Sequence, residues 1–343
     1  MKRLPLATAL SVALFGTSAA YAGGDFYADF PVTLQGYQGD ESHSVSYPGQ
    51  IARHVLHDSL KKLSGRSTGD NAAEIKAQMM AYFKGDAEGR AILAPTSKAG
   101  FEIKQDQVDQ LSKGKNLADK AYKGAVPGWP GNMSGEEVLA FMLDKAANNQ
   151  GGYDSVNGMD YIQLLSKTAM GAVFYNQAVD VYLDERLEAD RYPNDQPYKK
   201  GRHYTGKEHV WDEAFGYFGV PAHTMNLDAK TVYAITKGKP EAFKAADANG
   251  DGVVDLLTEM AFAHGYYAAA ADKGGKSNYL KTITQAFIDG RQLIADAQGE
   301  VLTDAQRARL KAYADTIKSN WERVIAEAVY KYAGSVYQDL KKI

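Results

Sequence analysis

Residues 204–219 read Y-T-G-K-E-H-V-W-D-E-A-F-G-Y-F-G, and this stretch predicts the helix around which the chain is organised. Thr205 or Gly206 can cap the start of a helix, and Gly219 followed by Pro221 ends one. At about 100° per residue, one side of this helix is apolar and largely aromatic. The residues on that side are Val210, Trp211, Ala214, Phe215 and Phe218. We therefore expect the helix to be held firmly against the core.

The other side of the same helix carries His209, Asp212, Glu213 and the small Gly216. One imidazole and two carboxylates can converge on a cation, and this set of donors suits iron, zinc or manganese. The alternative is the solvated face of an amphipathic helix. A single helix face rarely closes a coordination sphere, so a metal here would need ligands from elsewhere. The candidates, in order, are His54, His57 and His264.

Three stretches carry a resemblance to a known family. H-V-W-D-E-A-F-G-Y-F-G, beginning at His209, resembles the signature of a family of unknown function made of secreted, helix-rich bacterial envelope proteins. S-Y-P-G-Q-I-A-R around Gly49 and G-M-D-Y-I-Q-L-L around Met159 are similar to the same family. The likeness covers most of the chain that follows residue 22.

More distantly, the chain resembles the imelysin-like, iron-regulated proteins, whose mark is G-x-H-x-x-E. In this chain Gly206 lies three residues before His209, Asp212 lies three after it, and Glu213 follows one later. The resemblance implies two bundle-like halves and favours iron over zinc. It also implies, as an alternative function, a metallopeptidase with Glu213 or Glu208 as the base beside a metal-held water.

Residues 247–259, D-A-N-G-D-G-V-V-D-L-L-T-E, predict a separate calcium site. Oxygen donors alternate along the loop, Gly252 permits the tight turn, and Val254 would anchor the loop to the core. The twelfth position, where such loops carry a bidentate Glu, is Thr258. Either Glu259 reaches the ion or water fills the gap, and a turn without an ion is the alternative. The expected ligands are Asp247, Asn249, Asp251, the Val253 carbonyl, Asp255 and Glu259.

Helical periodicity and capping signals predict an all-α fold, a multi-helix bundle with short irregular segments. Ser134 with Glu137 and Thr303 with Gln306 have the spacing of capping boxes. The connection at 190–203 is rich in proline and charge, and two halves would divide there. The predicted helices cover residues 50–63, 72–83, 134–148, 159–187, 204–219, 228–235, 256–271, 279–297 and 303–340.

Composition restricts the function further. The formal net charge is −3 and no basic patch stands out, so nucleic acid is not an expected partner. The chain has no Cys, which excludes thiolate metal sites and Cys nucleophiles. H-E-x-x-H does not occur, which argues against a zinc protease of the usual type. The spacing G-x-S-x-G occurs at residues 65–69, but this stretch is predicted to be a loop and not the strand-to-helix elbow of a serine hydrolase.

The leading hypothesis is a periplasmic metal-associated binding protein linked to iron uptake or handling. Its expected partners are metal ions and an outer-membrane or periplasmic uptake component. An imelysin-like metallopeptidase is the second hypothesis. The third is a structural or docking protein of the envelope, with a calcium loop and no transition metal.

Residues 1–22 predict a cleavable signal peptide, with Lys2 and Arg3 before an apolar run and A-Y-A ending at Ala22. The remaining residues 23–343 form one helical domain with no expected transmembrane segment. Export to the periplasm is the expected result, with full secretion as the alternative. N-terminal sequencing of periplasmic material should therefore begin at Gly23, and an uncleaved Met1 form there would contradict this assignment.

Overall fold

The computed structural model describes residues 26–85, 89–188 and 191–341, so the signal peptide predicted at 1–22 lies outside the described residues. The predicted all-α class is confirmed, because helices account for nearly all regular structure in these ranges. The α-helices are α1 (Pro48–Ser64), α2 (Ala72–Phe83), α3 (Gly135–Asn148), α4 (Tyr161–Ala169), α5 (Gly206–Phe218), α6 (Ala229–Thr236), α7 (Phe243–Ala246), α8 (Ala263–Asp272), α9 (Tyr279–Asp296) and α10 (Asp304–Leu340).

Short elements connect the helices. The only sheet in the described ranges is an antiparallel pair of two-residue strands, β1 (Tyr153–Asp154) and β2 (Met159–Asp160). The single 3-10 turns are η1 (Tyr27–Asp29), η2 (Val108–Gln110), η3 (Ala118–Lys120), η4 (Pro130–Asn132), η5 (Gln150–Gly152), η7 (Glu185–Leu187), η8 (Thr224–Asn226) and η9 (Pro240–Ala242).

Side-chain caps mark several helix starts where the sequence predicts them. Ser134 and Glu137 form the expected capping box at the start of α3, and Thr303 with Gln306 does the same for α10. Asp228 accepts a hydrogen bond from the Thr231 N–H and so caps α6. Each cap satisfies N–H groups that the first helical turn leaves free.

The helix predicted over 159–187 changes type along its length. It begins as α4 and continues without a break into η6 (Met170–Tyr182), which has π-helical hydrogen bonding. The Leu183 N–H, for example, bonds to the carbonyl of Ala178, five residues back. The wider turn alters which residues share a face, so α-helical spacing alone misplaces the later residues of this element.

The helix predicted over 256–271 is wrong in its first half, because α8 begins only at Ala263. Residues 256–262 instead run alongside the end of α5. The Ala222 N–H donates to the Thr258 carbonyl, and the Phe262 N–H donates to the Gly219 carbonyl. Since these backbone groups are paired across segments, they are not available for helical hydrogen bonds.

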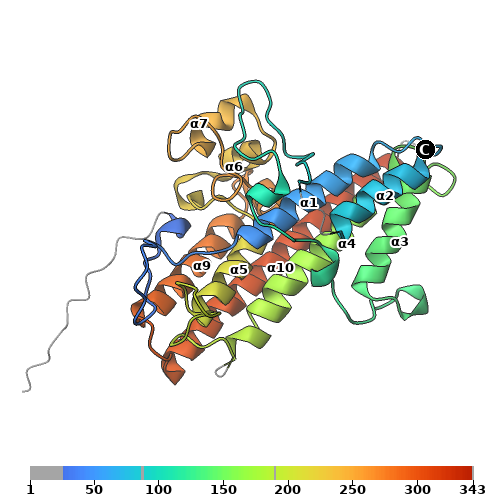
Figure 1. Ribbon diagram of the computed structural model, residues 1–343. Coiled ribbons are helices and arrows are strands. Elements are labelled where there is room, and N and C mark those ends of the chain that lie inside the picture. The colour runs from blue at the N-terminus through green and yellow to red at the C-terminus, as the bar shows by residue number, and fades with distance from the viewer. Residues whose placement is uncertain (1–25, 86–88, 189–190, 342–343) are drawn as a thin grey trace, which may run out of the picture.

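Helix α5 lies in the middle of the bundle (Figure 1) and packs against η6, α9 and α1. Helices α9 and α10 run along one another, and α1, α2, α3 and α4 cover the other end. The buried apolar residues, from Tyr27 to Val324, form one contiguous core. The division into two halves near 190–203 stays a prediction. No helix in the described ranges is both long enough and apolar enough to cross a membrane.

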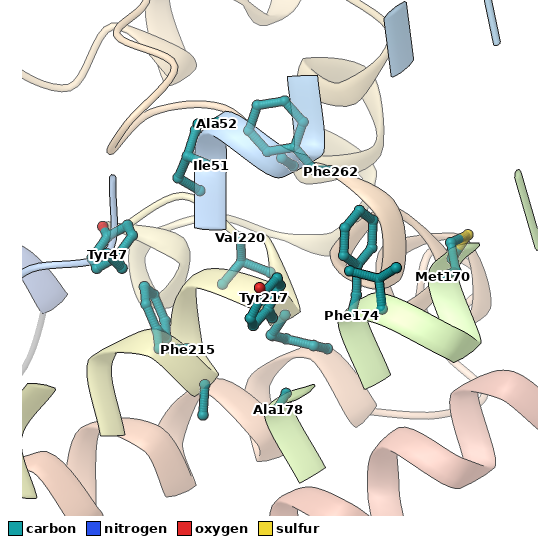
Figure 2. Packing of buried hydrophobic residues seen from close by; sticks show 14 of the residues in the cluster. Tyr47, Ile51, Ala52, Met170, Phe174, Ala178, Phe215, Tyr217, Val220 and Phe262 are labelled. Carbon is teal, nitrogen blue, oxygen red and sulfur yellow. The ribbon is translucent and has the colours of Figure 1, made fainter. Parts of the chain in front are cut away.

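Aromatic side chains of α5 fill the centre of this core. Figure 2 shows Phe215 and Tyr217 between Tyr47 at the start of α1 and Phe174 of η6. The Tyr217 ring stacks on Phe174 with ring centroids 5.8 Å apart. The residues of the predicted apolar side are all fully buried. Trp211 and Phe218 make ring contacts with Phe287 of α9, and Phe218 also contacts Trp321 of α10.

Close packing between α5 and α9 depends on a glycine. A Cβ on Gly290 would overlap the buried Trp211 ring. Gly290→Ala should therefore lower the free energy of unfolding by about 1–3 kcal/mol, even though alanine favours a helix. Chemical denaturation measures this change. The matched control is Gly334→Ala in α10, where a Cβ meets nothing. It should leave stability equal or raise it by up to about 1 kcal/mol, and equal losses in both variants would contradict the packing argument.

Candidate functional site

Both ends of α5 are fixed by local hydrogen bonds. Thr205, rather than Gly206, is the N-cap: its hydroxyl accepts the Glu208 N–H, and the Glu208 carboxylate accepts the Thr205 N–H at 2.8 Å. Gly219 ends the helix with φ 76°, a left-handed conformation that favours glycine. Only His209 and Glu213 within the helix keep any sizeable exposure, and their side chains are still only 12% and 13% exposed.

A buried ion cluster lies on the side of α5 that faces α9. The Arg291 guanidinium donates from Nε to Asp212 at 3.0 Å and from Nη1 to Glu208 at 3.2 Å. All three side chains are fully buried. Taking these charges out of water costs several kcal/mol each, so the cluster persists only because the charges compensate one another.

The N-terminal segment completes the same cluster. Asp212 accepts hydrogen bonds from the Tyr27 hydroxyl at 3.0 Å and from the Ser46 N–H at 3.1 Å. Glu208 accepts from Thr33 at 2.9 Å and from Ser44 at 3.1 Å. Ser44 also receives a hydrogen bond from Arg291. The cluster therefore joins three separate stretches of chain.

The structure therefore does not bring Asp212 together with His209 and Glu213, as the sequence grouped them, because Asp212 faces Arg291 and the N-terminal segment. Both oxygens of Asp212 are taken by Tyr27, Ser46 and Arg291. Burial raises the pKa of Asp212 to about 6, with Arg291 opposing the rise and Glu208 adding to it. In this structure Asp212 holds α5 against α9 and the N-terminal segment.

His209 and Glu213 do lie together at the edge of the core. The His209 Nε2 is 3.7 Å from a Glu213 oxygen that also accepts a hydrogen bond from Gln50 at 2.7 Å. Arg186 approaches the other oxygen of Glu213 at 3.6 Å. The His209 ring lies between Tyr204 and Tyr198, with centroid distances of 4.7 Å and 4.1 Å. Burial lowers the pKa of His209, so the imidazole is neutral at neutral pH.

The small size of Gly216 does not leave open space beside His209 and Glu213, because protein fills it. A Cβ at Gly216 would lie 2.8 Å from the Cβ of Tyr47 and 2.9 Å from that of Gln50. The glycine therefore lets the start of α1 approach α5 closely. It does not leave space for an ion.

The three histidines expected as partners of His209 are buried at separate packing positions. His54 bonds the Gly216 carbonyl at 3.0 Å and stacks on Phe262, and burial lowers its pKa to about 4. His264 packs against the Trp321 ring, and burial lowers its pKa to about 3. His57 contacts Ser166 and Asp58. In the described part of the chain, none of these three histidines forms a hydrogen bond, an ion pair or a ring contact with His209 or Glu213.

Across residues 26–85, 89–188 and 191–341, no three side chains among His, Cys, Asp and Glu are grouped so that they could hold a metal ion. His54, His57 and His264 were the expected partners of His209. His54 and His57 instead pack against η6 and α4, through Phe174 and Ser166 respectively.

The loop at residues 247–255 keeps the turn expected of a calcium loop. Asp247 accepts the N–H groups of Gly250, Asp251 and Gly252. Asn249 Oδ1 accepts the Asp251 N–H at 2.8 Å, and Asp251 Oδ1 accepts the Val253 N–H at 3.1 Å. The three side-chain oxygen donors thus lie within one tight turn. Each retains a lone pair that these hydrogen bonds do not use.

The carboxylates of Asp255 and Glu259, which the sequence predicts as calcium ligands, bond to other groups of the protein. Asp255 pairs with Lys104 at 2.9 Å and accepts a hydrogen bond from Gln105 at 2.7 Å. Glu259 is buried and accepts the backbone N–H groups of Ala248, Asn249 and Asp255. Glu259 thus closes the loop by hydrogen bonds to its backbone, and burial raises the pKa of its carboxyl.

Val254 fixes the loop to a distant segment, as its apolar character predicts. It is fully buried and forms a parallel β-bridge with Ile103. The Val254 N–H donates to the Glu102 carbonyl at 2.8 Å, and the Lys104 N–H donates to the Val254 carbonyl at 3.0 Å. The loop is therefore anchored by its backbone as well as by its side chains.

Arg291 is the central residue that the sequence analysis missed. Glu208 and Asp212 are spaced i, i+4 on a largely aromatic helix, and this pattern indicates a buried cation between them. The pattern does not identify which of the chain's Lys or Arg residues supplies it. Arg291 follows Asp212 by 79 residues, and this pairing becomes evident only from the packing of α9.

Removing the positive charge of Arg291 should strongly destabilise the fold. Arg291→Met leaves two buried carboxylates without a counter-charge, so we expect the free energy of unfolding to fall by about 3–5 kcal/mol. Thermal or chemical denaturation measures it. Adding Glu208→Gln and Asp212→Asn to the Met variant should recover part of the loss. The exposed Arg309, which bonds Tyr313, is the control, and Arg309→Met should change stability by less than about 1 kcal/mol. A mild effect of Arg291→Met would contradict the central role of the cluster.

Comparisons with known proteins give a family and no assigned activity. Neither the search of curated proteins nor the search of solved structures returned a match. The expected membership of a family of unknown function is confirmed, and the likeness to imelysin-like proteins stays a prediction. A family described as a domain of unknown function (DUF4856) matches residues 36–340, and the chain belongs to that family.

Proposed function

We propose that this protein is an exported, metal-associated binding protein of the bacterial envelope, and that its metal is one structural calcium ion in the 247–255 loop. The observation that carries the proposal is the arrangement of Asp247, Asn249 and Asp251. Their oxygens alternate along one turn that their own hydrogen bonds already hold in shape. Hard oxygen donors of this kind suit calcium.

The ion would be held by these three side chains, by the Val253 carbonyl and by water. Asp255 and Glu259 would support the loop rather than bind the ion, because their oxygens are engaged with Lys104, Gln105 and backbone N–H groups. With fewer carboxylate ligands than a full helix-loop-helix site, we expect weak binding. A dissociation constant of about 0.1–1 mM is typical of extracellular calcium modules.

The geometry gives less support to iron or zinc at α5. Asp212 is committed to Arg291, and His209 and Glu213 have no third ligand among the described His, Cys, Asp and Glu side chains. The geometry also gives little support to a metallopeptidase. Glu208, one of the two candidate bases, is enclosed by Arg291, Ser44 and Thr33. A link to iron handling therefore depends on the family resemblance alone.

Calcium should stabilise the fold. At about a hundred times its dissociation constant, one bound ion adds about 2.7 kcal/mol to the free energy of unfolding. Thermal unfolding of the mature protein with added calcium, with magnesium, and after chelation measures the effect. Asp251→Ala should remove most of the calcium-dependent rise in Tm, since it removes a ligand.

The matched control lies in the same loop. Asp255→Asn breaks the ion pair with Lys104 but removes no proposed ligand, so its calcium-dependent rise in Tm should persist. An unchanged rise in the Asp251 variant would show that calcium binds elsewhere or acts non-specifically. The absence of any rise in the unmutated protein would reject the calcium proposal itself.

A further inference from the structure

A cavity of about 490 Å³ lies away from both the Arg291 cluster and the calcium loop's proposed ligands. Its wall is formed by the end of α1, the end of α4, the segment after α6, the start of α8 and the loop at residues 93–103. This size is within the range of pockets that enclose small molecules. We name it the lysine pocket after the five lysines in its lining, which are Lys61, Lys62, Lys98, Lys167 and Lys237.

The charge of this lining is one-sided. The five lysines are accompanied by one carboxylate, Asp58. Asp58 is itself engaged, because its oxygen lies 3.1 Å from Nδ1 of His57. The other ring nitrogen of His57 is 3.0 Å from the Ser166 hydroxyl, which also lines the pocket. Asp58 is thus held at the wall by His57, and at longer range it also attracts Lys61 and Lys167.

The lysines are not neutralised by ion pairs. None of the five forms a salt bridge with any carboxylate in the described parts of the chain. Lys98 donates to the carbonyl of Lys237 at 2.9 Å, and Lys167 approaches the Gln163 side-chain oxygen at 3.3 Å. A carbonyl or amide oxygen takes one of three ammonium N–H groups, so donors remain for a ligand.

Helix dipoles explain only some of these residues. Lys61 and Lys62 occupy the last turn of α1, and Lys237 is the C-cap of α6, where lysines are favoured without any ligand. Lys98 lies in a loop, and its position has no such explanation. Lys167 is half-buried, so its ammonium group loses hydration that a bound anion would replace. The convergence of all five on one cavity is what indicates an anion.

The rest of the lining is apolar or aromatic. Ile162 and Met170 come from one wall, and Tyr266 and Tyr267 from another. The Lys237 ammonium lies 4.5 Å from the Tyr266 ring centroid, and Lys167 lies 5.1 Å from that of Tyr267. We propose that the lysine pocket binds a small organic anion that carries two or more negative charges, as phosphate or carboxylate groups, on a ring or other apolar frame.

Two probes with different charged groups test this class of ligand. Naphthyl phosphate and trimesate are both aromatic, and one carries phosphate while the other carries carboxylates. Isothermal titration calorimetry on the mature chain at low ionic strength should show one equivalent of at least one of them. The heat should weaken as salt is added, because exposed charges are screened. The one that binds more tightly identifies the preferred anionic group. Neutral naphthol should bind at least about tenfold more weakly than naphthyl phosphate.

Matched lysine variants locate the site. The triple substitution Lys61→Gln, Lys98→Gln and Lys237→Gln removes three positive charges from the pocket and keeps the side-chain length similar. We expect at least about tenfold weaker binding of the probe. The control triple, Lys113→Gln, Lys276→Gln and Lys318→Gln, removes the same charge from exposed positions outside the pocket and should change affinity less than about twofold. Thr96→Trp should also weaken binding, because it fills the pocket without changing its charge.

Three results would overturn the proposal. Equal weakening in the two triple variants would mean that the probes respond only to net charge. Binding of naphthol as tight as that of naphthyl phosphate would make the pocket an apolar site. No binding of either anion to the folded protein at millimolar concentration would reject it outright. Circular dichroism and Tm of each variant confirm that it is folded, so a loss of binding is attributable to the pocket.

Discussion

The fold depends on one buried arginine. Arg291 bridges Glu208 and Asp212, which lie one turn apart on α5, and thereby joins the middle helix to α9. Its guanidinium also lies 5.0 Å from the Phe30 ring centroid and donates to Ser44. A planar, always charged group with several fixed donors can satisfy two carboxylates and a hydroxyl together, which an ammonium group cannot do as well.

The cluster also explains why an irregular N-terminal segment has a defined path. Residues 26–47 contain little regular structure beyond η1 and an isolated bridge between Pro31 and His43. Their hydroxyl and N–H groups nevertheless complete the hydrogen bonds of Asp212 and Glu208. Leaving a buried carboxylate without hydrogen bonds costs more free energy than one hydrogen bond contributes. The carboxylates of Asp212 and Glu208 therefore hold the segment in one position.

Local signals in the sequence predicted local structure well. Capping pairs such as Ser134 with Glu137 fixed helix starts, and the aromatic face of residues 204–219 identified the central helix. Helical spacing placed Asp212 beside His209 and Glu213. It could not show that Asp212 would instead bond to α9 and to the N-terminal segment. The choice of partner depends on packing between residues far apart in sequence, such as Asp212 and Arg291.

The histidines illustrate the same limit in another way. A polar residue opposite an apolar stripe is expected to meet solvent or a ligand, yet a helix packed on both sides buries it against protein. Burial lowers the pKa values of His54 and His264 well below 7, so both imidazoles are neutral in the core. A sequence pattern that gives one helix face cannot distinguish a ligand site from a second packed face.

The proposed calcium loop and the lysine pocket both contact the segment at residues 102–104. Ile103 lines the pocket, and its neighbours Glu102 and Lys104 bond the backbone of Val254 in the loop. The side chain of Lys104 is also paired with Asp255 at the loop's end. An ion that stiffens the loop would therefore restrict one wall of the pocket as well. By linkage, an anion that requires this wall to be ordered would favour calcium binding to the same degree. The Arg291 cluster, which neither proposed site touches, would hold the helical frame constant while these two sites influenced one another.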